Sequence, residues 1–135
     1  MRRIFADAVY WVAIAHRKDQ WHAKAVQVSR RVGAATLVTT DEVMTEFLNH
    51  FSAYGDQMRA RAAGTARNLL NDPTVEVLPQ SHQTFLSGLA LYEVRSDKGY
   101  SLTDSISMVT MRQERITEVL THDDHFVQEG FIKLL

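Results

Sequence analysis

The sequence lacks cysteine and contains only two prolines among its 135 residues. Without cysteine, disulfides, thiolate zinc sites and cysteine nucleophiles are excluded. The scarcity of proline, together with the absence of repeats and low-complexity stretches, argues against linkers and tails. A chain of this length is long enough to bury one complete core. We therefore expect a single domain over residues 1–135.

Several motifs that would identify an enzyme class are also missing. The sequence has no G-x-G-x-x-G and no G-x-x-x-x-G-K-[ST], so nucleotide-binding loops are not supported. No Ser-His-Asp order or nucleophile elbow indicates a serine hydrolase. The six histidines show no H-E-x-x-H spacing, and surface or packing roles are expected for them. His50, one turn from Glu46, and His122 and His125, which flank Asp123, could still have an auxiliary role.

Long apolar runs are absent as well. No segment approaches the roughly 20 apolar residues of a membrane span, so no membrane association is expected. Arg2 and Arg3 followed by an apolar run loosely imitate a signal peptide, but Asp7 interrupts the run and leaves only Ala8 to Ala15. We therefore expect a cytoplasmic protein. The net charge of −1 permits a polyanionic substrate without indicating one.

Short apolar segments alternate with helical patterns along the chain. The expected strands are residues 4–6, 36–38, 75–78, 119–121 and 131–135, and six or seven helices connect them. This alternation is typical of a parallel sheet covered on both faces. The sequence thus predicts an α/β fold, a three-layer α/β/α arrangement with a short central parallel sheet of about five strands.

Helix ends are suggested by capping residues. Gly33 is expected to end the second helix, Thr39 and Glu42 have the spacing of a capping box, and Thr103 is expected to cap the helix carrying Asp104. In the helix that begins after Ser81, the expected buried residues are Phe85, Leu89 and Tyr92.

Four carboxylates occupy related places in this scheme. Asp7 follows the first strand, Asp123 follows the fourth, Asp104 lies in the first turn of a helix, and Glu46 lies one turn into another. On a helical wheel, Glu46 lies at the edge of the apolar face and Glu42 on the solvent side. Strand carboxyl ends and helix amino ends open onto one crevice in such sheets, so the four acids can meet if the first strand is central. Clustered carboxylates repel one another unless a cation lies between them, and Mg²⁺ or Mn²⁺ suits oxygen ligands.

Each acid also has an ordinary interpretation. Asp104 can be a first-turn helix residue, Asp7 a helix cap, Glu46 a surface acid and Asp123 a turn residue. Only the order of the four acids, and their positions relative to the strands, favours a metal site.

That order resembles the PIN-domain nucleases, and most closely the VapC-type toxins of bacterial toxin–antitoxin pairs. The resemblance covers essentially the whole chain. It is carried by Ile4-Phe5-Ala6-Asp7 with Trp11-Val12-Ala13, Leu37-Val38-Thr39-Thr40 with Val43-Met44-x-Glu46, Leu102-Thr103-Asp104-Ser105 with Ser107, and Leu120-Thr121-His122-Asp123-x-His125-Phe126.

The resemblance implies that Asp7, Glu46, Asp104 and Asp123 are the family's acidic quartet and bind Mg²⁺ or Mn²⁺. The implied activity is a metal-dependent endoribonuclease acting on RNA, the toxin of a toxin–antitoxin pair. A small antitoxin protein and a homodimer are the implied partners. The family usually has Thr or Ser after the first acid, where this chain has Ala8. Asp124 is an additional acid that could share or replace the role of Asp123.

Other functions stay open at this stage. A non-catalytic PIN-like binding module is the main alternative. A phosphotransfer enzyme would need Asp-x-Asp at Asp7, but position 9 is Val, and a receiver domain would need paired acids there. Five large apolar residues are candidates for an antitoxin or dimer contact, with core packing as the default expectation for each: Trp11, Trp21, Phe47, Phe51 and Tyr54.

Overall fold

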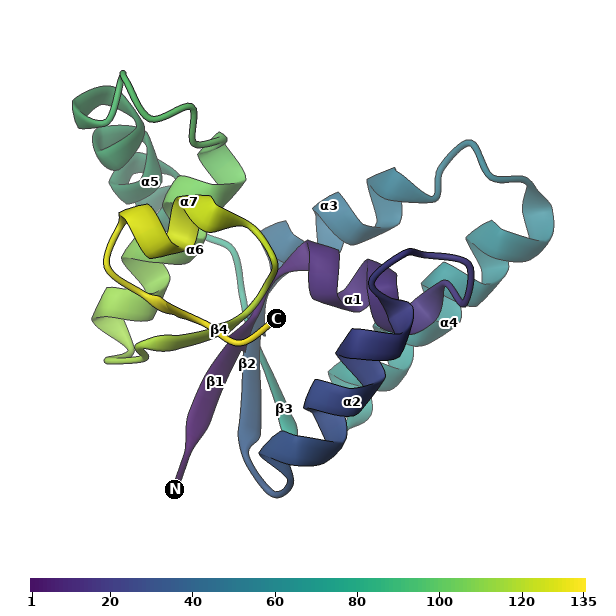
Figure 1. The fold of residues 1–135 in the computed structure, drawn as a ribbon. Helices are drawn as coiled ribbons and strands as arrows, with labels where there is room; N and C mark the ends of the chain where they lie inside the picture. The colour runs from purple at the N-terminus through teal and green to yellow at the C-terminus, as the bar shows by residue number, and fades with distance from the viewer.

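The computed structural model of the protein describes all 135 residues. Five strands form its centre, and helices surround them (Figure 1). The elements, in chain order, are β1 (Arg3–Ala6), α1 (Ala8–Ala15), α2 (His22–Val32), β2 (Thr36–Thr40), α3 (Asp41–His50), α4 (Asp56–Asn71), β3 (Val75–Leu78), α5 (His82–Val94), α6 (Leu102–Gln113), β4 (Glu118–Leu120), α7 (Asp124–Gln128) and β5 (Ile132–Lys133).

The strands form one parallel sheet in the order β3-β2-β1-β4-β5. β1 is the central strand, and its residues Ile4, Phe5 and Ala6 are completely buried. The chain builds the sheet outward from β1 to β3 and then crosses back to place β4 on the other side of β1. This change of direction makes the carboxyl ends of β1 and β4 the switch point, where ligands bind in open α/β sheets.

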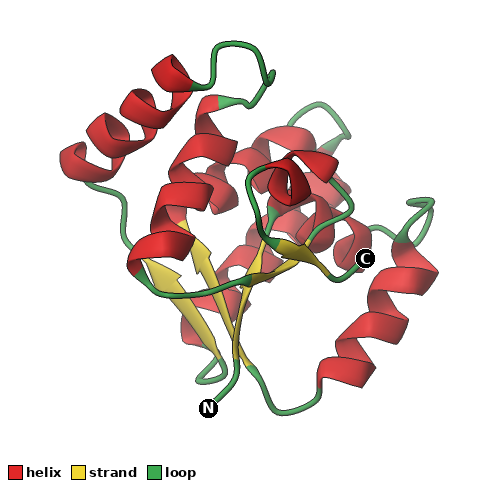
Figure 2. Ribbon diagram, turned by 60° about the vertical axis from the view of Figure 1, so that its left-hand side comes forward, coloured by secondary structure: helices red, strands yellow, loops and turns green.

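The predicted three-layer α/β/α arrangement is confirmed. Figure 1 shows α5, α6 and α7 on one side of the strands and α1, α2 and α4 on the other, and the rotated view in Figure 2 also places helices on both sides of the sheet. The layers share one hydrophobic core of 28 buried residues. None of the helices combines the length and the apolar character that crossing a bilayer requires.

Local capping differs in part from the sequence expectations. Gly33 ends α2 with a φ of 60°, as predicted. The proposed Thr39–Glu42 capping box is wrong, because Thr39 still belongs to β2 and its hydroxyl donates to Ala6 O at 2.9 Å. Thr40 caps α3 instead, since its hydroxyl accepts a hydrogen bond from Val43 N at 3.1 Å. Glu42 does not face solvent freely, because it accepts a hydrogen bond from Thr84 Oγ1 at 2.9 Å.

The expected buried face of α5 is wrong. Phe85 and Tyr92 are exposed, whereas Gly88 and Leu91 are buried. The reason is a close approach of two helices: a Cβ added to Gly88 would lie 2.3 Å from Ile106 Cγ1 of α6. α5 therefore turns Gly88 and Leu91 toward the core and leaves Phe85, Leu86 and Tyr92 on the surface.

Candidate active site

Strand register brings the first acid and the fourth strand together. Ala6 of β1 pairs with Leu120 of β4, so the next residues, Asp7 and Thr121, lie side by side. Asp7 N donates to Leu120 O at 3.2 Å, and the Thr121 hydroxyl donates to Asp7 Oδ2 at 2.9 Å. Asp7 is therefore fixed between two strands by hydrogen bonds that the sheet itself dictates.

Asp7 also begins α1. Its Oδ1 accepts a hydrogen bond from Ala8 N at 2.8 Å, and the side chain is buried. Burial and the neighbouring charges of Asp104 and Glu46 raise the pKa of Asp7 to about 7, although the Thr121 and Ala8 hydrogen bonds lower it. An acid with so high a pKa in a cluster of acids is typical of a functional site.

Asp104 reaches the same place from α6. Its helix is capped by Ser101, not by the predicted Thr103: Ser101 Oγ accepts from Asp104 N at 3.0 Å, and Asp104 Oδ2 accepts from Ser101 N at 3.2 Å. This capping box fixes the carboxylate over the first turn. Burial raises the pKa of Asp104, the charge of Asp123 adds to the rise, and the Ser101 and His125 contacts oppose it.

Glu46 faces the cluster from the second turn of α3. Burial raises its pKa, the charges of Asp104 and Asp123 raise it further, and the Thr103 hydroxyl lowers it. The charge of Glu46 also raises the pKa of Asp7, so Glu46 lies close to the other three acids. The structure thus brings all four predicted acids together at the carboxyl ends of β1 and β4.

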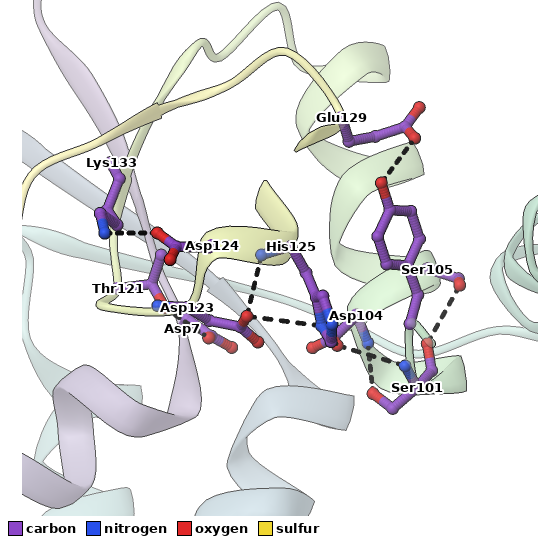
Figure 3. A network of polar contacts seen from close by, with 11 residues as sticks. Asp7, Ser101, Asp104, Ser105, Thr121, Asp123, Asp124, His125, Glu129 and Lys133 are labelled. Atoms are coloured by element: carbon purple, nitrogen blue, oxygen red, sulfur yellow. Dashed lines mark hydrogen bonds and ion pairs between the residues drawn. The ribbon is translucent and has the colours of Figure 1, made fainter. Parts of the chain in front are cut away.

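The most closely spaced donors are Asp104, Asp123 and His125, whose ligand atoms all lie within 4.8 Å of one another. Asp123 precedes α7, and its Oδ1 accepts a hydrogen bond from His125 N at 2.9 Å. Figure 3 shows Asp104 and Asp123 converging on the His125 ring. Asp124 points away and pairs with Lys133 at 2.6 Å, so it does not share the position of Asp123.

Sequence reasoning gave two of these residues too little weight. The sequence suggests an auxiliary role at most for His125, and it places Thr121 at the end of a strand and in the motif of the resemblance without giving it a role. The signal for His125 lies in its position two residues after Asp123, where the first turn of α7 returns the side chain toward the acid it follows. The signal for Thr121 is a hydroxyl at the end of a strand that neighbours β1.

Two other histidines are close to the acids in the sequence, but their rings pack against aromatic side chains. His122 stacks on Trp21, with ring centroids 4.4 Å apart and planes at 10°. His50 packs against Phe51 and Tyr54 at the outer end of α3. Neither belongs to the closely spaced donor group.

The apolar residues considered for partner contacts divide into two groups. Trp11, Phe47 and Phe51 belong to the core, so the default expectation of core packing is confirmed for them and the candidate partner contact is wrong. Trp21 is half-buried beneath His122, while Tyr54 is 49% exposed. Of these five residues, only Tyr54 is exposed enough to contact a partner.

The donor set fits a hard divalent cation. Three aspartates and a glutamate supply the oxygen ligands that Mg²⁺ and Mn²⁺ take in proteins. Burial first, and then the charges of neighbouring carboxylates, raises the pKa of Asp7, Glu46 and Asp104, so the ionised form of each is disfavoured without a cation. His125 Nδ1 is also buried with no hydrogen-bond partner. A cation between the acids would relieve both deficits.

Comparison with known proteins agrees with the fold. VapC20 of Mycobacterium tuberculosis, described as a sarcin-ricin loop cleaving toxin, superposes with a TM-score of 0.83 at 22% identity, covering 96% of this chain and 96% of that chain. FitAcB from Neisseria gonorrhoeae superposes with a TM-score of 0.68 at 12% identity, covering 98% of this chain and 96% of that chain. No curated protein matches the chain.

Sequence comparison identifies the class. The PIN domain family matches residues 4–131, nearly the whole chain. The chain therefore belongs to the PIN domain family, and the family expected from the four acids is confirmed.

Proposed function

We propose that the protein is a metal-dependent endoribonuclease that hydrolyses RNA phosphodiester bonds. The observation that carries this proposal is the convergence of Asp7, Glu46, Asp104 and Asp123 at the carboxyl ends of β1 and β4, three of them with raised pKa values. Buried acids placed close to one another are typical of sites where a cation binds or a reaction takes place.

Asp104 and Asp123 would hold Mg²⁺ or Mn²⁺, and Asp7 and Glu46 would complete the site directly or through water. Such an ion, when bound, polarises the phosphoryl oxygen, lowers the pKa of a bound water and offsets charge on the leaving oxygen. Asp7 is oriented by Thr121 and Ala8 N. The raised pKa of Glu46 brings its carboxyl closer to the range of a general base at neutral pH.

RNA as the substrate and a toxin role rest on two supports. The sequence resembles VapC-type toxins along its whole length, and the structure superposes on a toxin described as cleaving the sarcin-ricin loop. We infer a structured cellular RNA as the target and the cytoplasm as the place of action.

A small antitoxin protein and a second copy of the chain are the proposed partners. The exposed apolar side chains of α5 support a homodimer contact, since Phe85 and Tyr92 are 43% and 49% exposed. The antitoxin proposal is tested by the gene directly upstream, which should encode a short DNA-binding protein. The mass measured by light scattering tests the dimer.

The nuclease proposal is tested by cleavage of ribosomal RNA with Mg²⁺ or Mn²⁺, followed on denaturing gels. Wild-type protein should cleave with the metal and not with EDTA. Asp104→Asn and Glu46→Gln should each lose about a hundredfold or more of the rate.

Glu42→Gln is the matched control, since Glu42 lies on the same helix as Glu46 and binds Thr84 instead of the cluster. Its rate should match that of wild type. Undiminished cleavage by Asp104→Asn, or cleavage in EDTA, would refute the mechanism. A protein that neither cleaves RNA nor responds to metal would instead be a non-catalytic binding module.

A further inference from the structure

The imidazole of His125 occupies an unusual position between two carboxylates. Its Nδ1 lies 3.4 Å from Asp104 Oδ2 and 3.4 Å from Asp123 Oδ1 (Figure 3). Those oxygens come from α6 and from the residue that caps α7, segments about 20 positions apart in the sequence. His125 therefore completes a ring of three donors from two parts of the chain.

His125 Nδ1 has no hydrogen-bond partner although it is buried from solvent. The two oxygens are slightly too far away for good hydrogen bonds. A buried polar atom without a partner is uncommon in proteins and calls for an explanation such as an ion. Neighbouring donor atoms around a six-coordinate ion with bonds of about 2.1 Å lie about 3 Å apart. The two distances of 3.4 Å between His125 Nδ1 and the carboxylate oxygens need only a small contraction to match this value.

The ring is also held in this orientation from behind. The His125 and Tyr100 ring centroids lie 5.2 Å apart, and the Tyr100 hydroxyl donates to Glu129 Oε1 at 3.1 Å. Arg95 and Arg112 bind the same carboxylate. This packing restricts the orientation of the His125 ring, and the orientation of a histidine affects how it binds a metal ion.

We propose that His125 Nδ1 is a ligand of the divalent ion, together with Asp104 and Asp123, and that it makes the site prefer Mn²⁺ to Mg²⁺. This inference rests on the proposed function, since it requires that the acidic cluster holds a cation. Mg²⁺ is bound almost entirely through oxygen, whereas imidazole nitrogen suits transition metals. A nitrogen donor among the carboxylates therefore strengthens Mn²⁺ binding and leaves Mg²⁺ binding nearly unchanged.

Asp7 would have a different part in this arrangement. Both of its oxygens already accept hydrogen bonds, from Ala8 N and from the Thr121 hydroxyl. It lies outside the closely spaced donor group. Asp7 would therefore supply negative charge beneath the ion, directly or through water, while His125 supplies the selectivity.

The alternative role for His125 is that of a positive counter-ion to the two carboxylates. That role would make no bond from nitrogen to metal, and it would affect every divalent cation alike. Spectroscopy of the bound ion separates the two roles without any measurement of catalysis.

The test uses Mn²⁺ and Mg²⁺ alone, added to the purified full-length protein. Calorimetry gives both affinities, and electron spin echo modulation of the Mn²⁺-loaded protein detects nitrogen bonded to the ion. Wild type should show nitrogen coupling and bind Mn²⁺ at least about tenfold more tightly than Mg²⁺. His125→Ala should lose the coupling and about tenfold or more of the Mn²⁺ affinity, with little change for Mg²⁺.

His122→Ala is the matched control, because His122 is also next to Asp123 but stacks on Trp21. It should keep the coupling and both affinities. If His125→Ala fails to fold in EDTA, as judged by circular dichroism, His125→Gln replaces it with the same expectations.

Three results would overturn the inference: Mn²⁺-loaded wild type without nitrogen coupling, coupling that persists without His125, or equal loss of both metals. Each leaves the acidic metal site and the nuclease proposal standing. Wild type that binds neither metal would refute both the inference and the metal-dependent function.

Discussion

The Thr121 hydroxyl donates a hydrogen bond to Asp7 Oδ2 across 2.9 Å, where β1 and β4 end side by side. This bond favours the ionised form of an acid whose pKa is already raised to about 7 by burial and by Asp104. The hydrogen bond from Thr121 therefore lowers the pH at which Asp7 loses its proton. It also supplies Asp7 with a hydroxyl contact in a chain that has Ala8 where the family usually has Thr or Ser.

Thr121→Val should raise the pKa of Asp7 further, because the isosteric side chain cannot donate. The pH midpoint of Mn²⁺ or Mg²⁺ binding, and of RNA cleavage, should move upward. Thr65→Val is a matched control, since the Thr65 hydroxyl donates to Arg61 O on α4. An unchanged midpoint in Thr121→Val would contradict the role assigned to this bond.

The metal-free protein should lose stability as the pH rises. Asp7 has a pKa of 3.8 when unfolded and about 7 when folded, so between these values the folded state binds more protons. The free energy of unfolding therefore falls from about pH 4 to about pH 7, by a few kcal/mol, and then levels off. Glu46 and Asp104 shift in the same direction and add to the fall.

Asp7→Asn should remove most of this dependence, because the amide cannot ionise. In EDTA at pH 8 the variant should be more stable than wild type, as measured by urea unfolding. Stability of the wild type that stays constant or rises over this pH range would show that the cluster is less strained than the structure indicates.

Gly88→Ala should destabilise the protein by about 2 kcal/mol or more, because the added Cβ would lie 2.3 Å from Ile106 Cγ1 and 3.1 Å from Ile106 Cα. Gly64→Ala provides the opposite case, since a Cβ there meets nothing within 4 Å on helix α4. It should stabilise by about 0.5–1 kcal/mol. Equal effects of the two changes on urea unfolding would contradict the close packing of α5 on α6.

The Glu129 carboxylate ties α5, α6 and α7 together. Arg95, Arg112 and Tyr100 bind it, and their hydrogen bonds lower its pKa to about 2 despite its burial. Glu129→Gln should cost about 2 kcal/mol at pH 7, measured by urea unfolding. This stabilisation is present above the unfolded pKa of 4.5 and is lost as the pH falls toward 2.

Glu93→Gln, at an exposed position of α5, should change stability little and serves as the control. A Glu129→Gln protein as stable as Glu93→Gln at pH 7 would remove this cluster from the account of how α7 and His125 are positioned.

The sheet could be predicted because short apolar strands are a local pattern, and the four acids could be placed because each lies near the end of a strand or the start of a helix. β1 through β4 lie within a residue or two of their expected positions, and the central place of β1 fulfils the condition set for the acids to meet. The role of Gly33 at the end of α2 could be predicted for the same reason, since a positive φ at the end of a helix is a local requirement that glycine meets.

The failures came from contacts between distant segments. The buried face of α5 depends on Gly88 meeting Ile106, and Glu42 is held by Thr84, 42 residues away. The position of His125 depends on how α7 folds back over α6. Helical periodicity carries no information about which partner a face will meet, so these features required the tertiary structure.

The central claim is that the acids hold a divalent ion, and thermal unfolding with added Mg²⁺ or Mn²⁺ tests it most directly. Asp124→Asn is the matched control, because Asp124 neighbours Asp123 but pairs with Lys133. Wild type and Asp124→Asn should gain stability with millimolar metal and lose it in EDTA, whereas Asp104→Asn should gain none. A metal-induced rise in Tm for Asp104→Asn equal to that of wild type, or no rise in wild type, would contradict the claim.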